Sequence, residues 1–418
     1  MAWIDFVHFS CTILQVPLPT LRRHLSDEVA AAARQFPAVV LTGPRQSGKT
    51  TLLRSTFGSR AGYVNLDLPD LLALAKNDPR SFLEAHPPPV IFDEVQEAPE
   101  LLPFIKARID ERRDVPGQYL LTGSQNLLLN ERVSESLAGR VALFQLLPLS
   151  RRELDTAAPD GFPRASPPTG PVDSAALWTS FVRGSYPEIA LDPARDPWLW
   201  HQSYIRTYLE RDVRSLRQVG DLTSFQNFLR ALAVRSASLL NLHDLSRDLG
   251  IAVNTAKAWL SVLEATYQVI VVRPYFENVG KRLVKTPKVY FTDTGTLCSL
   301  AGLRDPEHAL HGPMAGAIFE TAVFGELVKQ SWNRGEEARI WFWRTTAGVE
   351  VDFVVEREQR LVPIECKTSA TPRREFASAI ELLRSELPDK VDAGFVVHPG
   401  DVAVPLGPQA SALPFRAL

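Results

Sequence analysis

The stretch LTGPRQSGKT at residues 41–50 constrains the fold of this chain more than any other. It carries the pattern G-x-x-x-x-G-K-[ST], with the apolar run 38–41 before it and a plausible helix start at 51–54 after it. A buried strand, a glycine-rich loop and a helix in that order are the context of a phosphate-binding loop. Glycine lets the backbone approach an anion closely, and the helix start presents free amides and the positive end of its dipole. The sequence therefore predicts a nucleotide site here.

The residues of this loop have separate roles in such a site. We expect Lys49 to reach the β- and γ-phosphates and the Thr50 hydroxyl to bind Mg²⁺. ATP and Mg²⁺ are thus the expected ligands. The residues predicted to contact the nucleotide run from the loop into the following helix: Gly43, Pro44, Arg45, Gln46, Ser47, Gly48, Lys49, Thr50 and Thr51.

Two carboxylates follow another apolar run. Residues 89–92 are apolar, and Asp93 and Glu94 come directly after them. Ligands bind at the carboxyl ends of the strands of a parallel sheet, so both acids should lie beside the loop. We predict that Asp93 holds the metal, directly or through water, and that Glu94 orients or deprotonates the attacking water. A third strand, 118–125, ends in hydroxyl and amide groups that either sense the γ-phosphate or form a plain turn.

Composition bounds the class of protein. The chain has 418 residues, of which 45% are hydrophobic and 22% charged, as in a globular protein with about two to four domains. A net charge of −2 gives no global basic signal, so any nucleic-acid surface must be local. Cys11, Cys298 and Cys366 lie far apart and suggest neither a disulfide framework nor a zinc site, which favours a reducing cytoplasm. Without a run of about 18 apolar residues, we expect no membrane role.

The order of elements predicts a chain of several units. We interpret residues 1–20 as a loose extension and not as a signal peptide. Strands and helices alternate over 21–155, which predicts a parallel sheet wrapped by helices. Residues 156–236 form a Pro- and Gly-rich linker and then a helical region. Arginines of that region either complete the nucleotide site as a lid or simply face solvent.

Residues 237–287 predict a winged helix-turn-helix. A short helix, a turn at Gly250, a second helix and a strand at 269–272 follow the order of that motif. The basic segment KRLVK at 281–285 lies where a wing would be, so the unit contacts either DNA or another protein. The second helix should bury Ala256, Trp259, Leu260 and Leu263 and present Asn254, Thr255, Lys257 and Ser261.

The last unit, 288–418, carries a second constellation. Glu320 lies on an apolar helical stripe, where an acid is costly unless it is paired or metal-bound. Asp352 lies on one strand of a predicted hairpin, and Glu365 and Lys367 share a face of the next strand. These four residues could bind Mg²⁺ and hold a water beside a phosphodiester, or they could be the wet face of an ordinary sheet.

Five segments resemble a family of bacterial and archaeal AAA-type P-loop ATPases with a C-terminal domain of unknown function. The likeness extends over nearly the whole chain from about residue 21. It is carried by GPRQSGKT at 43–50, FDEVQ at 92–96, LTGS at 121–124, YIRTYLERDV at 204–213 and KVYFTDTG at 288–295. The resemblance implies ATP binding and hydrolysis, a winged helix and a C-terminal fold similar to the PD-(D/E)xK nucleases.

The nuclease pattern would match at Glu320, Asp352, Glu365 and Lys367, although Val351 replaces the usual proline. The resemblance also implies an arginine that stabilises the transferred phosphate. Arg140 fits that role best. Arg206 and Arg211 are alternatives, and the sequence does not choose among the three.

Together these patterns predict an α/β protein. A P-loop ATPase core with a parallel sheet is followed by a helical lid, a winged helix-turn-helix and an α/β nuclease-like domain. Lys49, Glu94 and Arg140 would act in catalysis, and Thr50 and Asp93 would bind the metal. Two functions stay open: an ATP-gated nuclease acting on nucleic acid, and a nucleotide switch that binds DNA or a protein without cutting. An oligomer is compatible with either.

Overall fold

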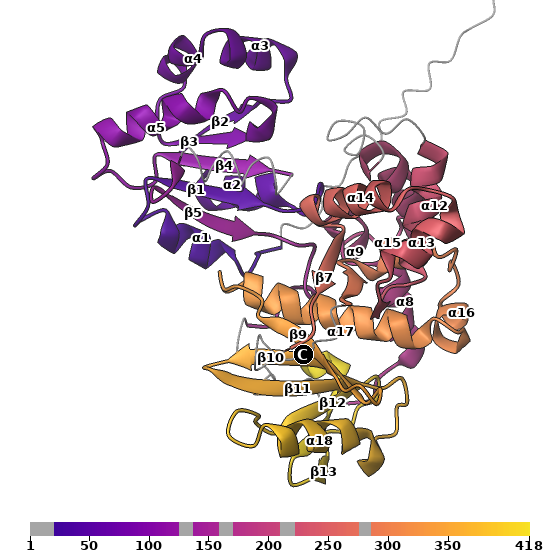
Figure 1. Cartoon of the computed structure of the whole chain (residues 1–418). Helices are drawn as coiled ribbons and strands as arrows, with labels where there is room; N and C mark the ends of the chain where they lie inside the picture. Colours follow the sequence, from indigo (N-terminus) through magenta and orange to yellow (C-terminus); the bar gives the residue numbers. More distant parts are fainter. Residues whose placement is uncertain (1–20, 125–136, 159–169, 210–221, 276–285) are drawn as a thin grey trace, which may run out of the picture.

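The computed structural model describes residues 21–124, 137–158, 170–209, 222–275 and 286–418. Figure 1 shows the N-terminal domain at the upper left, a largely helical middle region at the right and the C-terminal sheet at the bottom. Of the helices in these ranges, none combines the length and apolarity that a bilayer span requires.

The N-terminal domain is built on a five-stranded sheet in the order β2-β3-β4-β1-β5, and all of its pairings are parallel. The predicted parallel sheet is therefore confirmed. Its elements are α1 (Ser26–Ala32), β1 (Ala38–Thr42), α2 (Lys49–Phe57), β2 (Gly62–Asn65), α3 (Pro69–Asn77), α4 (Pro79–Ala85), β3 (Val90–Asp93), η1 (Val95–Glu97), α5 (Leu101–Glu111), β4 (Tyr119–Gly123), β5 (Val141–Gln145) and α7 (Arg151–Leu154).

Helices cover both faces of this sheet, and the alternation along β1 shows how. Val39 and Leu41 pack in the cluster formed with α1 and α2, whereas Ala38 and Val40 pack in the cluster formed with α3, α4 and α5. Side chains of a strand point alternately to its two faces, and a strand buried on both faces is apolar throughout. The carboxyl edge of the sheet carries the loop.

The middle region contains the predicted helices and a small antiparallel sheet in the order β6-β8-β7. Its elements are α8 (Ser174–Arg183), α9 (Pro187–Ala190), α10 (Pro197–Tyr204), the π-helix η2 (Ile205–Leu209), α12 (Leu222–Ala233), β6 (Ser238–Leu239), α13 (Leu242–Leu249), α14 (Val253–Ala265), β7 (Val269–Val272), β8 (Lys288–Phe291), α15 (Thr294–Leu300) and α16 (Pro306–His311). Gly250 ends α13 in the left-handed conformation, as a turn between two helices requires.

The helix-turn-helix elements occur in the expected order, and the four residues predicted to be buried on α14 are buried. The boundary at 287/288 is wrong, however, because β8 is the central strand of the sheet that also contains β6 and β7. One hydrophobic cluster also extends from the middle region into the C-terminal unit. A domain border cannot pass through a single sheet, so β8 belongs with the middle region.

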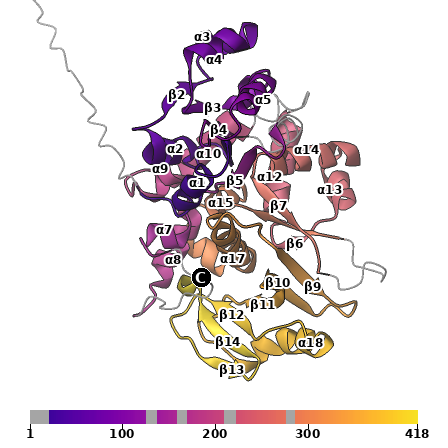
Figure 2. The same cartoon turned by 90° about the vertical axis from the view of Figure 1, so that its left-hand side faces the viewer.

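The C-terminal unit is a six-stranded mixed sheet in the order β13-β14-β12-β11-β10-β9. Figure 2 shows it below α17, with α18 on the lower side. The predicted hairpin is present, because β9 and β10 pair antiparallel. Its elements are α17 (Ala315–Trp332), β9 (Ile340–Arg344), β10 (Glu350–Arg357), β11 (Arg360–Cys366), η3 (Arg374–Ala377), α18 (Ser378–Glu386), β12 (Gly394–His398), β13 (Pro405–Gly407), β14 (Ala410–Pro414) and η4 (Phe415–Ala417).

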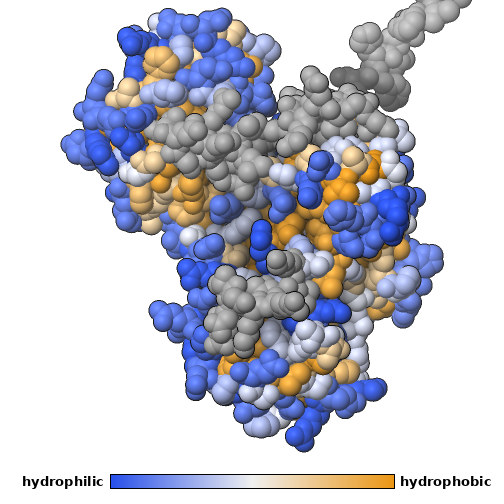
Figure 3. All heavy atoms as spheres, viewed as in Figure 1, coloured by the Kyte–Doolittle hydropathy of each residue, from blue (hydrophilic) through white to orange (hydrophobic). Residues whose placement is uncertain are grey.

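Hydrophobic surface accompanies the junction between these units. Figure 3 shows hydrophobic residues over β5 and around β7 and α14, while hydrophilic residues dominate the outer rim of this face. Leu143, on the edge strand β5, is 42% exposed.

Several predictions lie outside the described residues. They are the extension 1–20, Gln125 at the end of the third strand, most of the linker, Arg211, and the basic segment 281–285. They stay predictions from the sequence.

Candidate functional site

The predicted loop lies at the carboxyl edge of the sheet, between β1 and α2. Gly43 and Gly48 both have positive φ, and a Cβ on Gly43 would lie 2.1 Å from the carbonyl oxygen of Leu146. Only glycine fits such a close approach, which explains the glycine at the first position of the motif. No described side chain caps the N-terminus of α2 at Gly48, so its first amides stay available to an anion.

Polar groups line the inside of the loop. The Lys49 ammonium donates to the carbonyl oxygens of Gly43 (3.0 Å) and Pro44 (2.8 Å), so it is held within the curve of the loop. The hydroxyl of Ser47 is buried and has no hydrogen-bond partner among the described residues. A buried hydroxyl without a partner is costly, and a phosphate oxygen would satisfy it. The donor set therefore fits a polyphosphate.

Asp93 is the polar centre of the site. The Thr50 hydroxyl donates to its carboxylate and lies 2.9 Å from each of the two oxygens, and Thr122 donates to the same carboxylate. Tyr63 donates a further bond of 2.9 Å, and burial together with that bond raises the pKa of Tyr63 to about 12. The Thr50 hydroxyl and the Asp93 carboxylate are hard oxygen ligands side by side, which suits Mg²⁺.

Glu94 follows in an unusual backbone conformation, with φ 57° and ψ 46°. Its amide donates to Thr122 Oγ1 at 3.1 Å, and its carboxylate accepts from Gln96, which also donates to Ser124 Oγ. Burial alone would raise the pKa of Glu94, but Lys49, Gln96 and Arg45 outweigh it and hold that pKa below its ordinary value. Glu94 is thus ionised at neutral pH beside two cationic side chains of the loop.

The structure does not bring Arg140 to this site. Ala38, the first residue of β1, donates its amide to the carbonyl oxygen of Arg140, whereas the loop follows the last residue of β1. Five residues at ~3.3 Å each separate the two edges by roughly 16 Å. Arg140 pairs instead with Asp110 at 2.6 Å. The prediction that Arg140 contacts the transferred phosphate is therefore wrong within a single chain.

The other arginines divide differently. Arg183 donates to the carbonyl oxygens of Ile189 and Asp192 and so closes its own turn. Arg206 is exposed on η2, two residues after Tyr204, whose hydroxyl donates to the carbonyl oxygen of Arg45 at 3.4 Å. The arginine of the loop itself, Arg45, is the one whose charge acts on Glu94.

Arg23, a buried arginine outside the motif, binds the backbone of the loop. Arg23 donates to the carbonyl oxygens of Ser47 (2.7 Å) and Leu147 (2.8 Å) and pairs with Glu153 at 2.8 Å. Burial alone would raise the pKa of Glu153, but Arg23 and two backbone amides lower it to about 2. Sequence reasoning missed this pair, which joins residues 130 positions apart.

The middle region reaches the loop at two points. The Thr42 hydroxyl, directly before the loop, lies 2.5 Å from the hydroxyl of Tyr267, which comes two residues after the end of α14. Gln268 donates to the hydroxyl of Tyr204, which bonds the loop at Arg45. Tyr267 has φ 59°, an uncommon conformation for a bulky residue that is held here by its buried surroundings.

The segment after β5 also contacts the C-terminal unit. Lys329 on α17 donates to the carbonyl oxygen of Leu149 at 3.0 Å and pairs with Glu326 at 3.2 Å. Glu326 in turn accepts the Arg151 amide at 2.8 Å. The segment that ends in Glu153, the partner of Arg23, is thus packed directly on α17.

The predicted nuclease residues do come together at the junction of α17 with β10 and β11. Asp352 accepts the amide of Cys366 at 2.8 Å, and Glu365 pairs with Lys367 at 2.5 Å. Glu320 accepts from the Tyr290 hydroxyl at 2.6 Å. Burial and the nearby Asp352 raise the pKa of Glu320 to about 8 and that of Glu365 to about 7.

The same junction contains a lysine that the sequence analysis did not assign. The ammonium of Lys288 lies 2.9 Å from Glu320, 2.5 Å from Glu350 and 3.8 Å from Asp352. Within the described ranges, no group of three or more His, Cys, Asp or Glu side chains is arranged to hold a metal ion. The carboxylates of Glu320, Glu350 and Asp352 therefore share one ammonium. The sequence did contain a signal for this role of Lys288, because a lysine begins an otherwise apolar strand.

The helix-turn-helix surface is mixed in charge. Asn254 and Lys257 are exposed on α14, as predicted, and Thr255 and Ser261 are partly exposed. One acid accompanies them, since Glu264 of α14 is exposed as well. DNA contact rests on the segment 281–285, which lies outside the described residues, and stays a prediction.

Comparisons with known proteins divide the chain similarly. Residues 35–155 match an AAA domain, residues 174–307 match a domain of unknown function (DUF8612), and residues 315–418 match another (DUF4143). The border between the second and third falls after β8, in agreement with the sheet pairing.

Two curated proteins match over nearly the full chain. They are the uncharacterized proteins Rv2008c of Mycobacterium tuberculosis and Mb2031c of Mycobacterium bovis. Each is 31% identical over 408 residues, which cover 97% of this chain and 85% of the relative.

Solved structures show weaker likeness. The Walker-type ATPase PABY2304 of Pyrococcus abyssi is 17% identical, with a TM-score of 0.42 over 66% of this chain and 94% of that one. The RuvB Holliday junction branch migration motor of Thermotoga maritima is 16% identical, with a TM-score of 0.27 over 60% of this chain and 87% of that one. The family assignment rests on the sequence matches.

Proposed function

This chain belongs to the AAA-type P-loop ATPase family, and from that premise we propose that it hydrolyses MgATP and transmits the state of its nucleotide site to the middle and C-terminal regions. The observation that carries the proposal is the convergence of Lys49, Thr50, Asp93 and Glu94 at one edge of a parallel sheet. Residues from the loop and from the adjacent strand meet where ligands of such sheets bind.

The chemistry requires little covalent work from the protein. Phosphoryl transfer to water needs mainly positioning and compensation of charge on the phosphate oxygens. Thr50 and Asp93 would hold Mg²⁺, which supplies part of that compensation. Lys49 and Arg45 would contribute positive charge, and ionised Glu94 would orient the attacking water and accept its proton. Thr122 and Ser124 would hold Asp93 and Glu94 in place.

Hydrolysis is tested by phosphate release from ATP in Mg²⁺ and in excess EDTA. We expect turnover in Mg²⁺ only, and no ATP binding by Lys49→Met, because Lys49 is the cation held inside the loop. Absence of turnover in Mg²⁺ under all conditions would contradict the proposal. Turnover that persists in Lys49→Met would place the reaction elsewhere in the chain.

Transmission of the nucleotide state is supported by the contacts behind the loop. Tyr267 touches Thr42 directly before the loop, and Arg23 joins Ser47 to the segment packed on α17. These contacts are buried and specific in geometry, so a loop that shifts on binding nucleotide would move them. Of the two predicted functions, the nucleotide switch requires only this connection and no cleavage chemistry.

The variant Tyr267→Phe should separate nucleotide binding from transmission. In wild type, binding of a slowly hydrolysed ATP analogue should slow amide hydrogen exchange both at the loop and over α14 and β7, relative to the protein without nucleotide. Because Tyr267→Phe removes only the hydroxyl that faces Thr42, we expect the protection of the loop to persist and that of α14 and β7 to vanish. The cost in stability should be about 0.5–1.5 kcal/mol, as for one hydrogen bond.

Tyr119→Phe is the matched control, because the Tyr119 hydroxyl is buried without a partner among the described residues and belongs to the first residue of β4, at the other edge of the sheet. It should leave both responses intact. If the analogue protects α14 in Tyr267→Phe as fully as in wild type, the Tyr267 contact does not transmit the nucleotide state.

A further inference from the structure

We propose that Lys288 is the resident cation of the C-terminal acidic cluster, which in this chain is closed to divalent metal. The cluster comprises Glu320 on α17, Glu350 and Asp352 on β10, and Glu365 on β11. In this role Lys288 joins the middle region to the C-terminal sheet, and the cluster does not support metal-dependent cleavage.

The position of the ammonium carries the proposal. A single atom, Nζ of Lys288, lies within 4 Å of carboxylates of Glu320, Glu350 and Asp352, and the residue is 3% exposed. A divalent ion would bind these carboxylates at about 2.0–2.6 Å. It would therefore have to occupy the space that the ammonium fills, and the two cannot be present together.

The backbone fixes Lys288 in this position. Lys288 pairs with Leu239 of β6 on one side and with Val272 of β7 on the other, so the strand cannot slide away without breaking both ladders. Tyr290, on the same face of β8 two residues later, donates to Glu320. Two consecutive inward side chains of the strand thus bind the same helical carboxylate.

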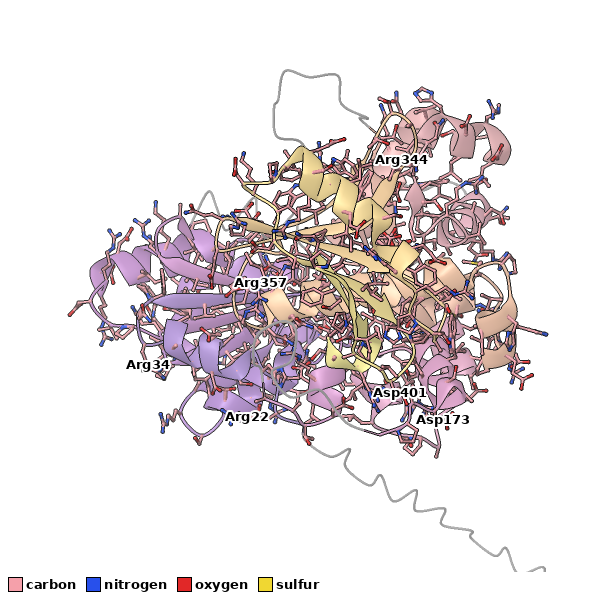
Figure 4. All side chains as sticks on the ribbon, turned by 90° about the horizontal axis from the view of Figure 1, so that it is seen from below. Arg22, Arg34, Asp173, Arg344, Arg357 and Asp401 are labelled. Atoms are coloured by element: carbon pink, nitrogen blue, oxygen red, sulfur yellow. The ribbon has the colours of Figure 1, made fainter. Side chains whose placement is uncertain are left out.

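Two further carboxylate oxygens of the cluster have cationic partners from the protein. Arg344, seen at the upper side of the C-terminal sheet in Figure 4, pairs with the second oxygen of Glu350 at 2.7 Å. Lys367 pairs with Glu365. Three cationic side chains therefore face four carboxylates and compensate most of their charge. Withdrawal of Lys288 would leave buried carboxylates unpaired, which is costly unless another cation replaces it.

Binding of Mn²⁺ to the full chain tests the proposal. The measurement uses Asp93→Asn, which removes the proposed metal ligand of the nucleotide site, so that any ion counted lies elsewhere. We expect this protein to bind no Mn²⁺ at the cluster. Adding Lys288→Met should create a site for one Mn²⁺ per chain, and adding Asp352→Asn to that variant should abolish it.

Lys329→Met is the matched control, because Lys329 is a similarly buried lysine that pairs with the single carboxylate of Glu326. In the Asp93→Asn background it should gain no Mn²⁺ site. Mn²⁺ bound by Asp93→Asn alone and lost on adding Asp352→Asn would overturn the proposal. A folded Lys288→Met protein that binds no Mn²⁺ would overturn it as well. Such a result would mean that the Lys288 ammonium does not occupy the position of a divalent ion.

Circular dichroism reports whether Lys288→Met folds. If it does not, the comparison of Asp93→Asn with Asp93→Asn plus Asp352→Asn still decides, because both retain Lys288. None of these outcomes depends on ATP turnover, so the test is separate from that of the proposed hydrolysis.

Discussion

The variant Glu94→Gln should hydrolyse ATP about 10²–10⁴-fold more slowly than wild type, the range over which a general base contributes. Its ATP affinity should stay within about threefold of wild type, because Gln keeps the size of the side chain and the loop that binds the phosphates is unchanged. Phosphate release gives the turnover number, and calorimetric titration with MgATP gives the dissociation constant. The variant should therefore remain in the ATP-bound state.

Glu97→Gln is the control for this change, since it removes a carboxylate of the same type three residues later on η1. Its turnover should stay close to that of wild type. Equal losses in both variants would show that the effect is not specific to Glu94. Loss of ATP binding in Glu94→Gln would contradict the role assigned to this residue.

The variant Arg23→Met should lose about 3–5 kcal/mol of unfolding free energy, because it leaves the buried carboxylate of Glu153 without its partner. It should also weaken ATP binding about tenfold or more, since the loop loses a charged donor to Ser47 that contributes ~1.5–3 kcal/mol. Urea unfolding followed by circular dichroism measures the first effect. Titration with MgATP in the absence of urea measures the second.

Arg22→Met tests whether these losses belong to the buried pair. Arg22 lies at the outer edge of the N-terminal domain (Figure 4) and pairs with Asp27, with side chains 75% and 69% exposed. Exposed pairs contribute about 0–1 kcal/mol, so this neighbour should lose little stability and no ATP affinity. Similar losses in both variants would mean that Arg23 has no special role in the loop.

The nucleotide site could be predicted because its residues obey local rules. The loop needs glycines at fixed spacing, and Asp93 and Glu94 follow a buried strand, so the chain direction alone brings them to the same edge. The role predicted for Arg140 was wrong because of the same rule of chain direction. A residue that precedes a parallel strand lies at the amino edge, and the sequence analysis assigned it a role at the opposite one.

The partners of these residues could not be predicted, because they depend on how distant segments pack. Arg23 meets Glu153 across 130 positions, and Tyr267 meets Thr42 across 225. A helical glutamate on an apolar stripe indicated that Glu320 needs a partner. Pattern alone did not distinguish a metal from the ammonium of Lys288, since both satisfy a buried carboxylate.

The central claim is that this chain hydrolyses ATP at its loop without cleaving nucleic acid. It is tested most directly by following phosphate release and the integrity of supercoiled and linear DNA in the same tubes with Mg²⁺. Wild type, Glu94→Gln and Asp352→Asn are compared. We predict phosphate release that Glu94→Gln abolishes, with intact DNA in every tube. Absence of phosphate release, or nicking that disappears only in Asp352→Asn, would contradict the claim.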